Sequence, residues 1–346
     1  MALLELKNVD IEYRTEKGTL KAVEDISFTL EEGERIGLVG ESGCGKTTIA
    51  KSLMRLLPDN GRISNGEIIF KGEDIVTKSA EEIRKLRWKH IAIISQSAMS
   101  ALNPVYTVGS QIIEPILAHT NMSSKDAYNR AVEVFRMVGL EEKRLKSFPH
   151  QMSGGMKQRA IIAMALTLEP SLIIADEPTT ALDVVVQDKI LNQIIQIQKE
   201  INTSMVFITH DISVVSETCN TIIVMYGGKI MEKSSTRNFF KNPFHPYSLG
   251  LQNAFPSIAD IGEELISIPG TPPDLMNLKP GCRFQDRCPF VTEKCQVETP
   301  GLLEVSSEHF VACHYTEKVE EFRIESKKSE TWENVQERLI LAGTEV

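Results

Sequence analysis

Apolar and polar residues alternate with a period of two in several stretches near the start of the chain, the pattern of strands with one buried face. These stretches lie at 4–7, 11–13, 22–30 and 66–70. They predict an antiparallel β layer, because a strand that packs on a core through one face is apolar only at every second position. The segment 35–39 is instead apolar almost throughout, and the helical stretch that follows at 47–57 stops at Pro58.

Further along, short and nearly continuous apolar segments at 91–95, 172–175 and 205–208 predict strands that are buried on both faces. A helix predicted at about 184–201 separates the last two strands, as in a parallel βαβ unit. Between about 103 and 168 the apolar period becomes helical, so this block is expected to form an inserted helical lobe. The pattern predicts an α/β fold with an antiparallel β layer, a mostly parallel core sheet and an inserted helical lobe.

The pattern changes in the last third of the chain. After a hairpin predicted at 221–231, prolines recur and long periodic segments end. Such a loop-rich segment builds little core of its own and therefore needs a cross-link. A length of 346 residues is sufficient for one large and one smaller domain. We expect a first domain at 1–240, a small Pro- and Cys-rich C-terminal appendage at 241–320, and a charged tail at 321–346 that is a short surface helix or disordered.

Candidate chemistry begins with Gly-Glu-Ser-Gly-Cys-Gly-Lys-Thr at 40–47, a P-loop between a predicted strand and a predicted helix. Its glycines allow backbone N–H groups to surround phosphate oxygens, and the helix N-terminus adds its positive dipole end. Lys46 is expected to reach the β- and γ-phosphates, and the Thr47 hydroxyl to bind Mg²⁺. Cys44 is either a small residue that fits the loop or a thiol made reactive by the local positive potential. The residues predicted to bind ATP here are Gly40, Ser42, Gly43, Cys44, Gly45, Lys46, Thr47 and Thr48.

The apolar strand at 172–175 ends in two carboxylates, Asp176 and Glu177. At the tip of a buried strand, Asp176 can hold Mg²⁺ directly or through water, and Glu177 can accept a proton from the attacking water. The alternative is an acidic pair that only caps the next helix.

Three other residues are candidates for the same site. His210 follows the strand at 205–208, which places it at the carboxyl edge of a parallel sheet, where it can bind the γ-phosphate and orient water. Gln96 also ends a strand and can reach Mg²⁺ or the water. Tyr13 can stack on adenine. The alternatives are a surface or capping residue for His210 and a half-buried strand residue for Tyr13.

A second phosphate-binding helix start is predicted at Ser153, Gly154 and Gly155. One γ-phosphate does not need two such helix ends in the same chain. The simplest interpretation is that ATP lies between the P-loop of one subunit and the Ser-Gly-Gly turn of another, in a head-to-tail dimer.

The set of motifs resembles that of the ATPase subunits of ABC transporters, in the same order. It comprises Tyr13, 40–47, Gln96, 153–159, Asp176, Glu177, 181–183 and His210. The resemblance spans 1–235 and implies an ABC-type ATPase whose dimer closes on ATP. It also implies that a membrane permease contacts the lobe near 97–110. Met152 and Thr180 depart from the usual Leu and Ser at their positions, without affecting the chemistry.

Other motifs resemble those of dipeptide and oligopeptide importer ATPases, and more closely the D-type than the F-type subunit. They lie at 102–109, 245–247, 268–273, 281–284, 287–289 and 312–314. The resemblance implies a heterodimer with a second ABC ATPase, docked on two integral-membrane permeases and supplied by an extracytoplasmic peptide-binding protein. Related importers carry nickel, heme or another small solute, so those cargoes remain the alternative.

Four of the six cysteines are concentrated in the Pro-rich segment, namely Cys282, Cys288, Cys295 and Cys313. In a reducing compartment such a group favours a metal site over disulfides. The spacing lacks the close Cys pairs of a zinc knuckle, whereas an iron–sulfur cluster tolerates other spacings. The family resemblance implies a 4Fe–4S cluster here, which we expect to be structural, with zinc, disulfides or free thiols as the alternatives.

Composition limits the remaining choices. The net charge of −9 argues against nucleic acid as a partner, and hence against an ABC-type machine that acts on DNA or ribosomes. No apolar run reaches the about 20 residues of a membrane span, and no signal peptide is recognisable. We therefore expect a cytoplasmic protein, peripheral on the inner face of the cell membrane.

A third possible function is that of an iron or redox sensor, in which the Cys cluster regulates the ATPase.

Overall fold

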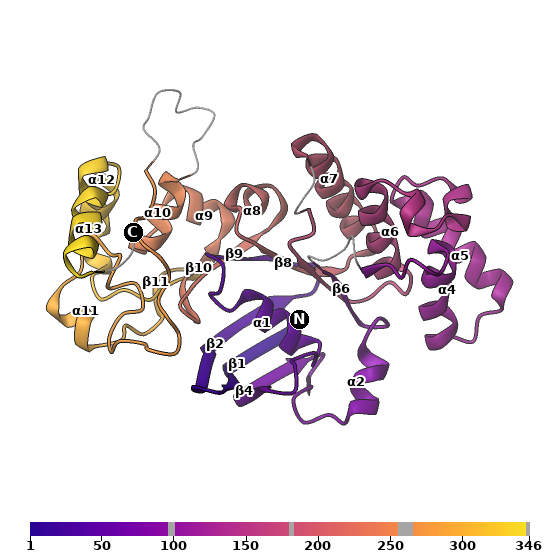
Figure 1. The fold of residues 1–346 in the computed structure, drawn as a ribbon, viewed down its shortest axis with the longest axis horizontal. Helices are drawn as coiled ribbons and strands as arrows, with labels where there is room; N and C mark the ends of the chain where they lie inside the picture. The colour runs from indigo at the N-terminus through magenta and orange to yellow at the C-terminus, as the bar shows by residue number, and fades with distance from the viewer. Residues whose placement is uncertain (96–100, 180–182, 255–265, 344–346) are drawn as a thin grey trace.

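The computed structural model describes residues 1–95, 101–179, 183–254 and 266–343. Two sheets form its centre, with helices around them and a helical lobe to one side (Figure 1). The C-terminal helices lie at the opposite end of the molecule from this lobe (Figure 1).

The smaller sheet is antiparallel, with the order β2-β1-β4-β5. Its strands are β1 (Ala2–Thr15), β2 (Gly18–Glu31), β4 (Gly61–Phe70) and β5 (Glu73–Asp74). Leu4 lies opposite Leu30 on one side and Phe70 on the other, and all three side chains are buried. The alternating pattern therefore produces the predicted antiparallel layer, because its apolar positions share one face.

The larger sheet has the order β11-β12-β10-β9-β3-β8-β7-β6. Five of its strands are parallel: β9 (Thr221–Tyr226), β3 (Arg35–Val39), β8 (Ser204–Thr209), β7 (Leu172–Asp176) and β6 (Ile91–Ile94). The antiparallel strands are β10 (Lys229–Ser235), β12 (His309–Val311) and β11 (Leu303–Ser306). Every residue of β7 and β8 is buried, as their continuous apolar sequences predict. The mostly parallel core sheet is confirmed.

The helices surround the sheets. They are α1 (Lys46–Leu53), α2 (Ala80–Leu86), α4 (Val108–His119), α5 (Ser124–Met137), α6 (Gly154–Leu166), α7 (Val184–Ile201), α8 (Ile212–Thr218), α9 (Thr236–Lys241), α10 (Pro246–Asn253), α11 (Glu293–Val297), α12 (Val319–Glu325) and α13 (Ser329–Leu341). Short 3-10 turns are η1 (Glu142–Lys146), η2 (Pro149–Gln151) and η3 (Thr316–Lys318). Helix α1 ends four residues before the expected boundary at 57, because Arg55 turns the chain with φ of 49°. None of the described helices is long and apolar enough to cross a membrane.

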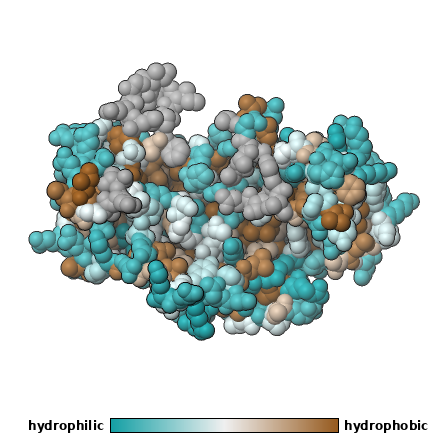
Figure 2. Space-filling view, viewed as in Figure 1, coloured by the Kyte–Doolittle hydropathy of each residue, from teal (hydrophilic) through white to brown (hydrophobic). Residues whose placement is uncertain are grey.

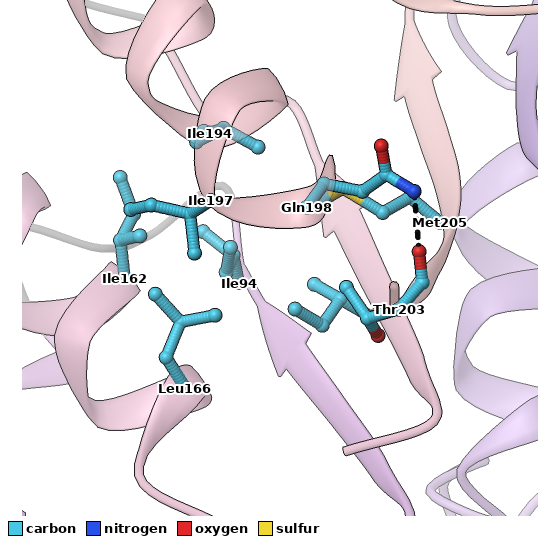
Figure 3. Close-up of a pocket in the computed structure, with 9 residues that line it drawn as sticks. Ile94, Ile162, Leu166, Ile194, Ile197, Gln198, Thr203 and Met205 are labelled. Atoms are coloured by element: carbon cyan, nitrogen blue, oxygen red, sulfur yellow. Dashed lines mark hydrogen bonds between the residues drawn. The ribbon is translucent and has the colours of Figure 1, made fainter. Parts of the chain in front are cut away.

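The helical lobe packs on the core sheet through α6, and α7 packs beside α6. A small cavity of about 10 Å³ remains there, lined mostly by aliphatic side chains, among them Ile94, Ile162 and Ile197 (Figure 3). At its edge, the Gln198 amide donates to the Thr203 carbonyl over 2.6 Å (Figure 3). The lobe and the sheet thus form one continuous core.

The C-terminal region differs from the expectation of a separate Cys-rich appendage. Strand β12 pairs with β10, with Glu232 opposite Val311, so the region extends the core sheet. Of the two alternatives for the charged tail, a short surface helix or disorder, its described part is helical and contributes to α12 and α13, but α13 is not only a surface helix. Trp332 and Val335 of α13 are buried, because they occupy one face of the helix three residues apart.

Candidate functional site: a phosphate-binding loop at the carboxyl edge of the core sheet

The P-loop connects β3 to α1, and its glycines are required by its shape. Gly40 and Gly45 have φ of 148° and 106°, which other residues rarely adopt. A Cβ on Gly40 would lie 2.1 Å from the Met225 carbonyl oxygen, and one on Gly45 would lie 2.8 Å from that of Ala22. The loop therefore depends on β2 and β9, which lie far from it in sequence.

Lys46 begins α1 and is buried, with 6% of its surface exposed. Its ammonium donates to the carbonyls of Gly40 and Glu41 over 2.7 and 2.9 Å, so its side chain folds back across the loop. A buried ammonium beside backbone N–H groups is suited to binding phosphate.

Burial raises the pKa of the neighbouring Cys44 thiol, against the opposing effect of Lys46. This supports the interpretation of Cys44 as a small residue that fits the loop rather than a reactive thiol.

Asp176 ends β7 beside the P-loop, and the Thr47 hydroxyl donates to its Oδ1 over 3.3 Å. Burial raises the pKa of Asp176, while the hydrogen bond from Thr47 lowers it. A divalent cation would favour the ionised carboxylate at this position. The hydroxyl and carboxylate are oxygen ligands of the kind that Mg²⁺ takes.

Glu177 is turned toward His210. Its backbone has φ of 48°, and its N–H donates to the Ile208 carbonyl over 2.8 Å, which ties the end of β7 to β8. His210 Nδ1 lies 3.1 Å from Glu177 Oε1 at the end of β8. The structure thus brings these two candidates together at the carboxyl edge that also holds Lys46 and Asp176.

Two of the remaining predicted residues, Tyr13 and Ser153, are placed by hydrogen bonds to other residues. The Tyr13 hydroxyl donates to Thr48 of α1 over 3.3 Å, so Tyr13 lies beside the helix that follows the P-loop. Ser153 is the N-cap of α6 and accepts from the Met156 N–H over 3.4 Å. Figure 1 shows α6 in the helical lobe and α1 next to the smaller sheet, so the two helix starts belong to different parts of the molecule. Gln96 and residues 180–182 lie outside the described residues.

All six cysteines carry free thiols, so the disulfide alternative is not realised. Four of them, Cys282, Cys288, Cys295 and Cys313, line one cavity of about 20 Å³. Burial raises the pKa of Cys282 to about 12 and that of Cys313 to about 11, so both thiols are protonated at neutral pH in the absence of a cation. Within the described parts of the chain, no three His, Cys, Asp or Glu residues are grouped so that they could hold a metal ion. The positions of the side chains therefore do not support the expected metal site.

Sequence reasoning missed one contact of the P-loop. Arg287, in the Cys-rich segment, forms a double hydrogen bond to the carboxylate of Glu41, the second residue of the loop. The sequence signal was the place of Arg287 in the motif at 287–289, which supports the family resemblance but assigns no role to the arginine. Sequence patterns describe neighbouring residues, so they do not predict a contact between two residues that are 246 positions apart.

Comparison with known proteins agrees with this geometry. The family model of ABC transporters matches residues 23–180, and that of the oligopeptide/dipeptide transporter C-terminal region matches residues 231–295. The dimeric post-hydrolysis ATP-binding cassette MJ0796, bound to ADP and Pi, superposes with a TM-score of 0.62 and 29% identity. The superposition covers 68% of this chain and 99% of MJ0796.

Two relatives are similar over most of their length. The oligopeptide transport ATP-binding protein OppD of Escherichia coli (strain K12) is 45% identical over 90% of this chain and 93% of its own. The dipeptide transport ATP-binding protein DppD of Lactococcus lactis subsp. cremoris (strain MG1363) is 43% identical over 89% of both chains. The chain therefore belongs to the ATP-binding proteins of oligopeptide and dipeptide ABC transporters.

Proposed function

We propose that this chain hydrolyses ATP to power the import of dipeptides or oligopeptides through a membrane ABC transporter. The observation that carries the proposal is the P-loop with Asp176, Glu177 and His210 at one sheet edge, in a chain 45% identical to an oligopeptide transport ATP-binding protein. Importers of nickel, heme or another small solute are not favoured, because the relatives compared above are named for peptides.

The residues divide the chemistry between them. Lys46 leaves the carbonyls of its own loop and binds the β- and γ-phosphates of ATP, together with the backbone N–H groups of the P-loop. Thr47 and Asp176 hold Mg²⁺, with Gln96 as the third expected ligand. The cation neutralises phosphate charge when it is bound. Glu177 accepts a proton from the attacking water, and His210 orients that water toward the γ-phosphate.

Ser153, Gly154 and Gly155 bind the ATP that is held by a second ABC ATPase subunit, and Tyr13 stacks on adenine. Two observations support this arrangement: the helix start of α6 lies in a different part of the molecule from α1, and the similar cassette MJ0796 forms a dimer (Figure 1). Closure of the heterodimer on ATP, and its opening after hydrolysis, drives the transport cycle.

The remaining partners are two integral-membrane permeases and, indirectly, an extracytoplasmic peptide-binding protein. The chain is then a cytoplasmic protein on the inner face of the membrane. Part of the helical lobe near 97–110 contacts a permease, and Val105 and Tyr106 there are 74% and 58% exposed. Figure 2 shows that the lobe carries scattered apolar residues among hydrophilic ones. The support is the adjacent pair Val105 and Tyr106, because large apolar side chains that are exposed side by side mark contact surfaces.

The test is reconstitution of this chain in liposomes with its partner ATPase, the two permeases and the binding protein. Peptides of two to five residues are each compared with nickel and heme as cargo. The proposal predicts that peptide raises ATP hydrolysis severalfold and accumulates on the far side of the membrane only when Lys46 is intact, with Lys46→Ala as the control. Stimulation by nickel or heme alone would contradict it.

We also propose that the cavity between Cys282, Cys288, Cys295 and Cys313 holds a 4Fe–4S cluster that stabilises this segment. One observation supports this proposal: the four thiols line one cavity, although in the described residues they are not grouped closely enough to hold a metal ion as they stand. Bound iron would also stabilise thiolates that burial otherwise disfavours.

Metal analysis of the full chain, purified without oxygen, tests the cluster. About four iron and four sulfide per protein, both lost in Cys288→Ser, are expected. Stoichiometric zinc would contradict the cluster, and absence of metal would contradict any metal role. If redox change of the cluster altered the ATPase rate, the function would be regulatory rather than structural.

A further inference from the structure

A buried arginine, Arg287, connects the Cys-rich segment to the nucleotide site. Arg287 Nη1 and Nη2 donate to the two carboxylate oxygens of Glu41 over 2.6 and 2.9 Å. Such a bidentate pair is among the stronger ion pairs of proteins, and its two parallel hydrogen bonds fix the direction of the carboxylate. Glu41 is part of the P-loop itself, between Gly40 and Ser42.

The surroundings hold Arg287 in this position. It is 3% exposed, and it also donates to the carbonyls of Ile268 and Pro269 and to the Tyr226 hydroxyl. Burial is the largest influence on the pKa of Arg287 and lowers it, but the hydrogen bonds that Arg287 donates to Glu41 and Tyr226 and the charges of these two residues together raise the pKa overall, so the guanidinium stays charged.

Glu41 is also fixed through its backbone. The Glu41 N–H donates to the hydroxyl of Tyr247 in α10 over 3.0 Å. Tyr226, Tyr247 and Phe284 pack around the pair, with ring centroids 4.7 to 5.2 Å apart. The region after β10 thus contacts both the side chain and the backbone of one P-loop residue.

The charge of Glu41 makes this contact relevant to ATP. A carboxylate in a phosphate-binding loop repels the triphosphate, and the repulsion is strong where water is partly excluded. The paired guanidinium cancels this charge and holds the carboxylate on the side of the Cys-rich segment.

We propose that Arg287 is a positioning residue for nucleotide binding, which neutralises Glu41 and holds its carboxylate away from the phosphates of bound ATP. The region after β10 is therefore a part of the ATP site. Helix α13 supports the same contact from behind, because Arg338 donates to the carbonyls of Asp286 and Cys288, the two neighbours of Arg287, over 3.0 and 2.9 Å.

The test compares Arg287→Gln, Glu41→Gln and the double variant in the full chain, with binding of fluorescent Mg-ATP as the readout. Arg287→Gln should raise the Kd by about tenfold, because an unpaired carboxylate then faces the phosphates. Glu41→Gln alone should bind at least as tightly as wild type. The double variant should return to within about twofold of wild type, because the repelling charge is gone.

Arg283→Gln is the matched control. Arg283 joins the same segment to Glu24 of β2 by an ion pair, but it does not contact the P-loop. Its Kd for Mg-ATP should equal that of wild type, and circular dichroism should confirm the fold of each variant. Arg287→Lys retains a buried cation but lacks the two-pronged geometry of the guanidinium, so its Kd for Mg-ATP should lie between those of wild type and Arg287→Gln. This variant replaces Arg287→Gln in the test if Arg287→Gln does not fold.

Two results would overturn the proposal. One is wild-type affinity in Arg287→Gln, or in Arg287→Lys if only that variant folds. The other is a double variant that binds as weakly as Arg287→Gln, which would show that Arg287 only supports the fold.

Discussion

Asp176 and Glu177 are neighbours in sequence, but their surroundings suit them to different tasks. Asp176 is 5% exposed and bonded to Thr47, whereas the positive φ of Glu177 turns its side chain toward His210. The backbone conformation at one residue therefore separates the proposed cation ligand from the proposed base. Strained conformations of this kind recur at functional sites.

Glu177→Gln should abolish ATP turnover and leave ATP binding unchanged. The amide retains the shape and hydrogen-bonding reach of the carboxylate but cannot accept the proton of the attacking water. A loss of at least about 100-fold in kcat is expected, because general bases contribute on this scale. Phosphate release and nucleotide binding, measured separately, check it. Lys46→Ala is the complementary control and should weaken binding itself; undiminished hydrolysis in Glu177→Gln would exclude the role.

Among the elements, α13 has a larger structural part than its charged sequence suggests. Trp332 is 3% exposed, and its Nε1 donates to the Ser326 carbonyl over 2.8 Å. A Cβ on Gly250 of α10 would lie 2.7 Å from the Trp332 ring, so the two helices pack closely. Because α10 also carries Tyr247, α13 stabilises a helix that contacts the P-loop.

Trp332→Ala should lower the free energy of unfolding by about 3–5 kcal/mol, the usual cost of removing a buried tryptophan. Asn334→Ala on the exposed face of the same helix is the matched control and should change it by less than about 0.5 kcal/mol. Denaturant unfolding followed by circular dichroism measures both. Equal midpoints for the two variants would mean that the tail does not contribute to stability.

At the scale of the whole molecule, the chain presents two phosphate-binding helix starts in separate parts. The P-loop precedes α1 beside the smaller sheet, and the Ser-Gly-Gly turn precedes α6 in the helical lobe (Figure 1). A second ATPase subunit would contribute a P-loop and a Ser-Gly-Gly turn of its own. Each ATP would then lie between the P-loop of one chain and the Ser-Gly-Gly turn of the other.

Gly154→Asp should therefore leave ATP binding to the isolated chain unchanged and reduce hydrolysis by the assembled transporter. A carboxylate at the start of α6 would repel the phosphates held by the partner subunit, and a loss of about tenfold or more is expected. Nucleotide affinity of the isolated chain and ATPase activity of the complex are the two measurements. Weakened binding in the isolated chain would place the Ser-Gly-Gly turn at its own P-loop instead.

Local patterns predicted those parts of the fold that depend on neighbouring residues. The helix at 184–201, the buried strands β7 and β8, and the hairpin of β9 and β10 lie where periodicity placed them. The P-loop was recognisable because its glycines and lysine are consecutive. Such features depend on the periodicity of apolar side chains and on the conformational freedom of the backbone, and both can be read from neighbouring residues in the sequence.

The sequence by itself thus determined the ATPase motifs and the α/β core. Only the tertiary structure decided that β12 joins the core sheet, that α13 is buried against α10, and that Arg287 pairs with Glu41. These contacts join residues far apart in the chain, and they form because folding buries charged and aromatic groups that must then find partners. Many carboxylates in the sequence could pair with Arg287, and the sequence pattern does not distinguish between them. The folded structure places Glu41 beside it.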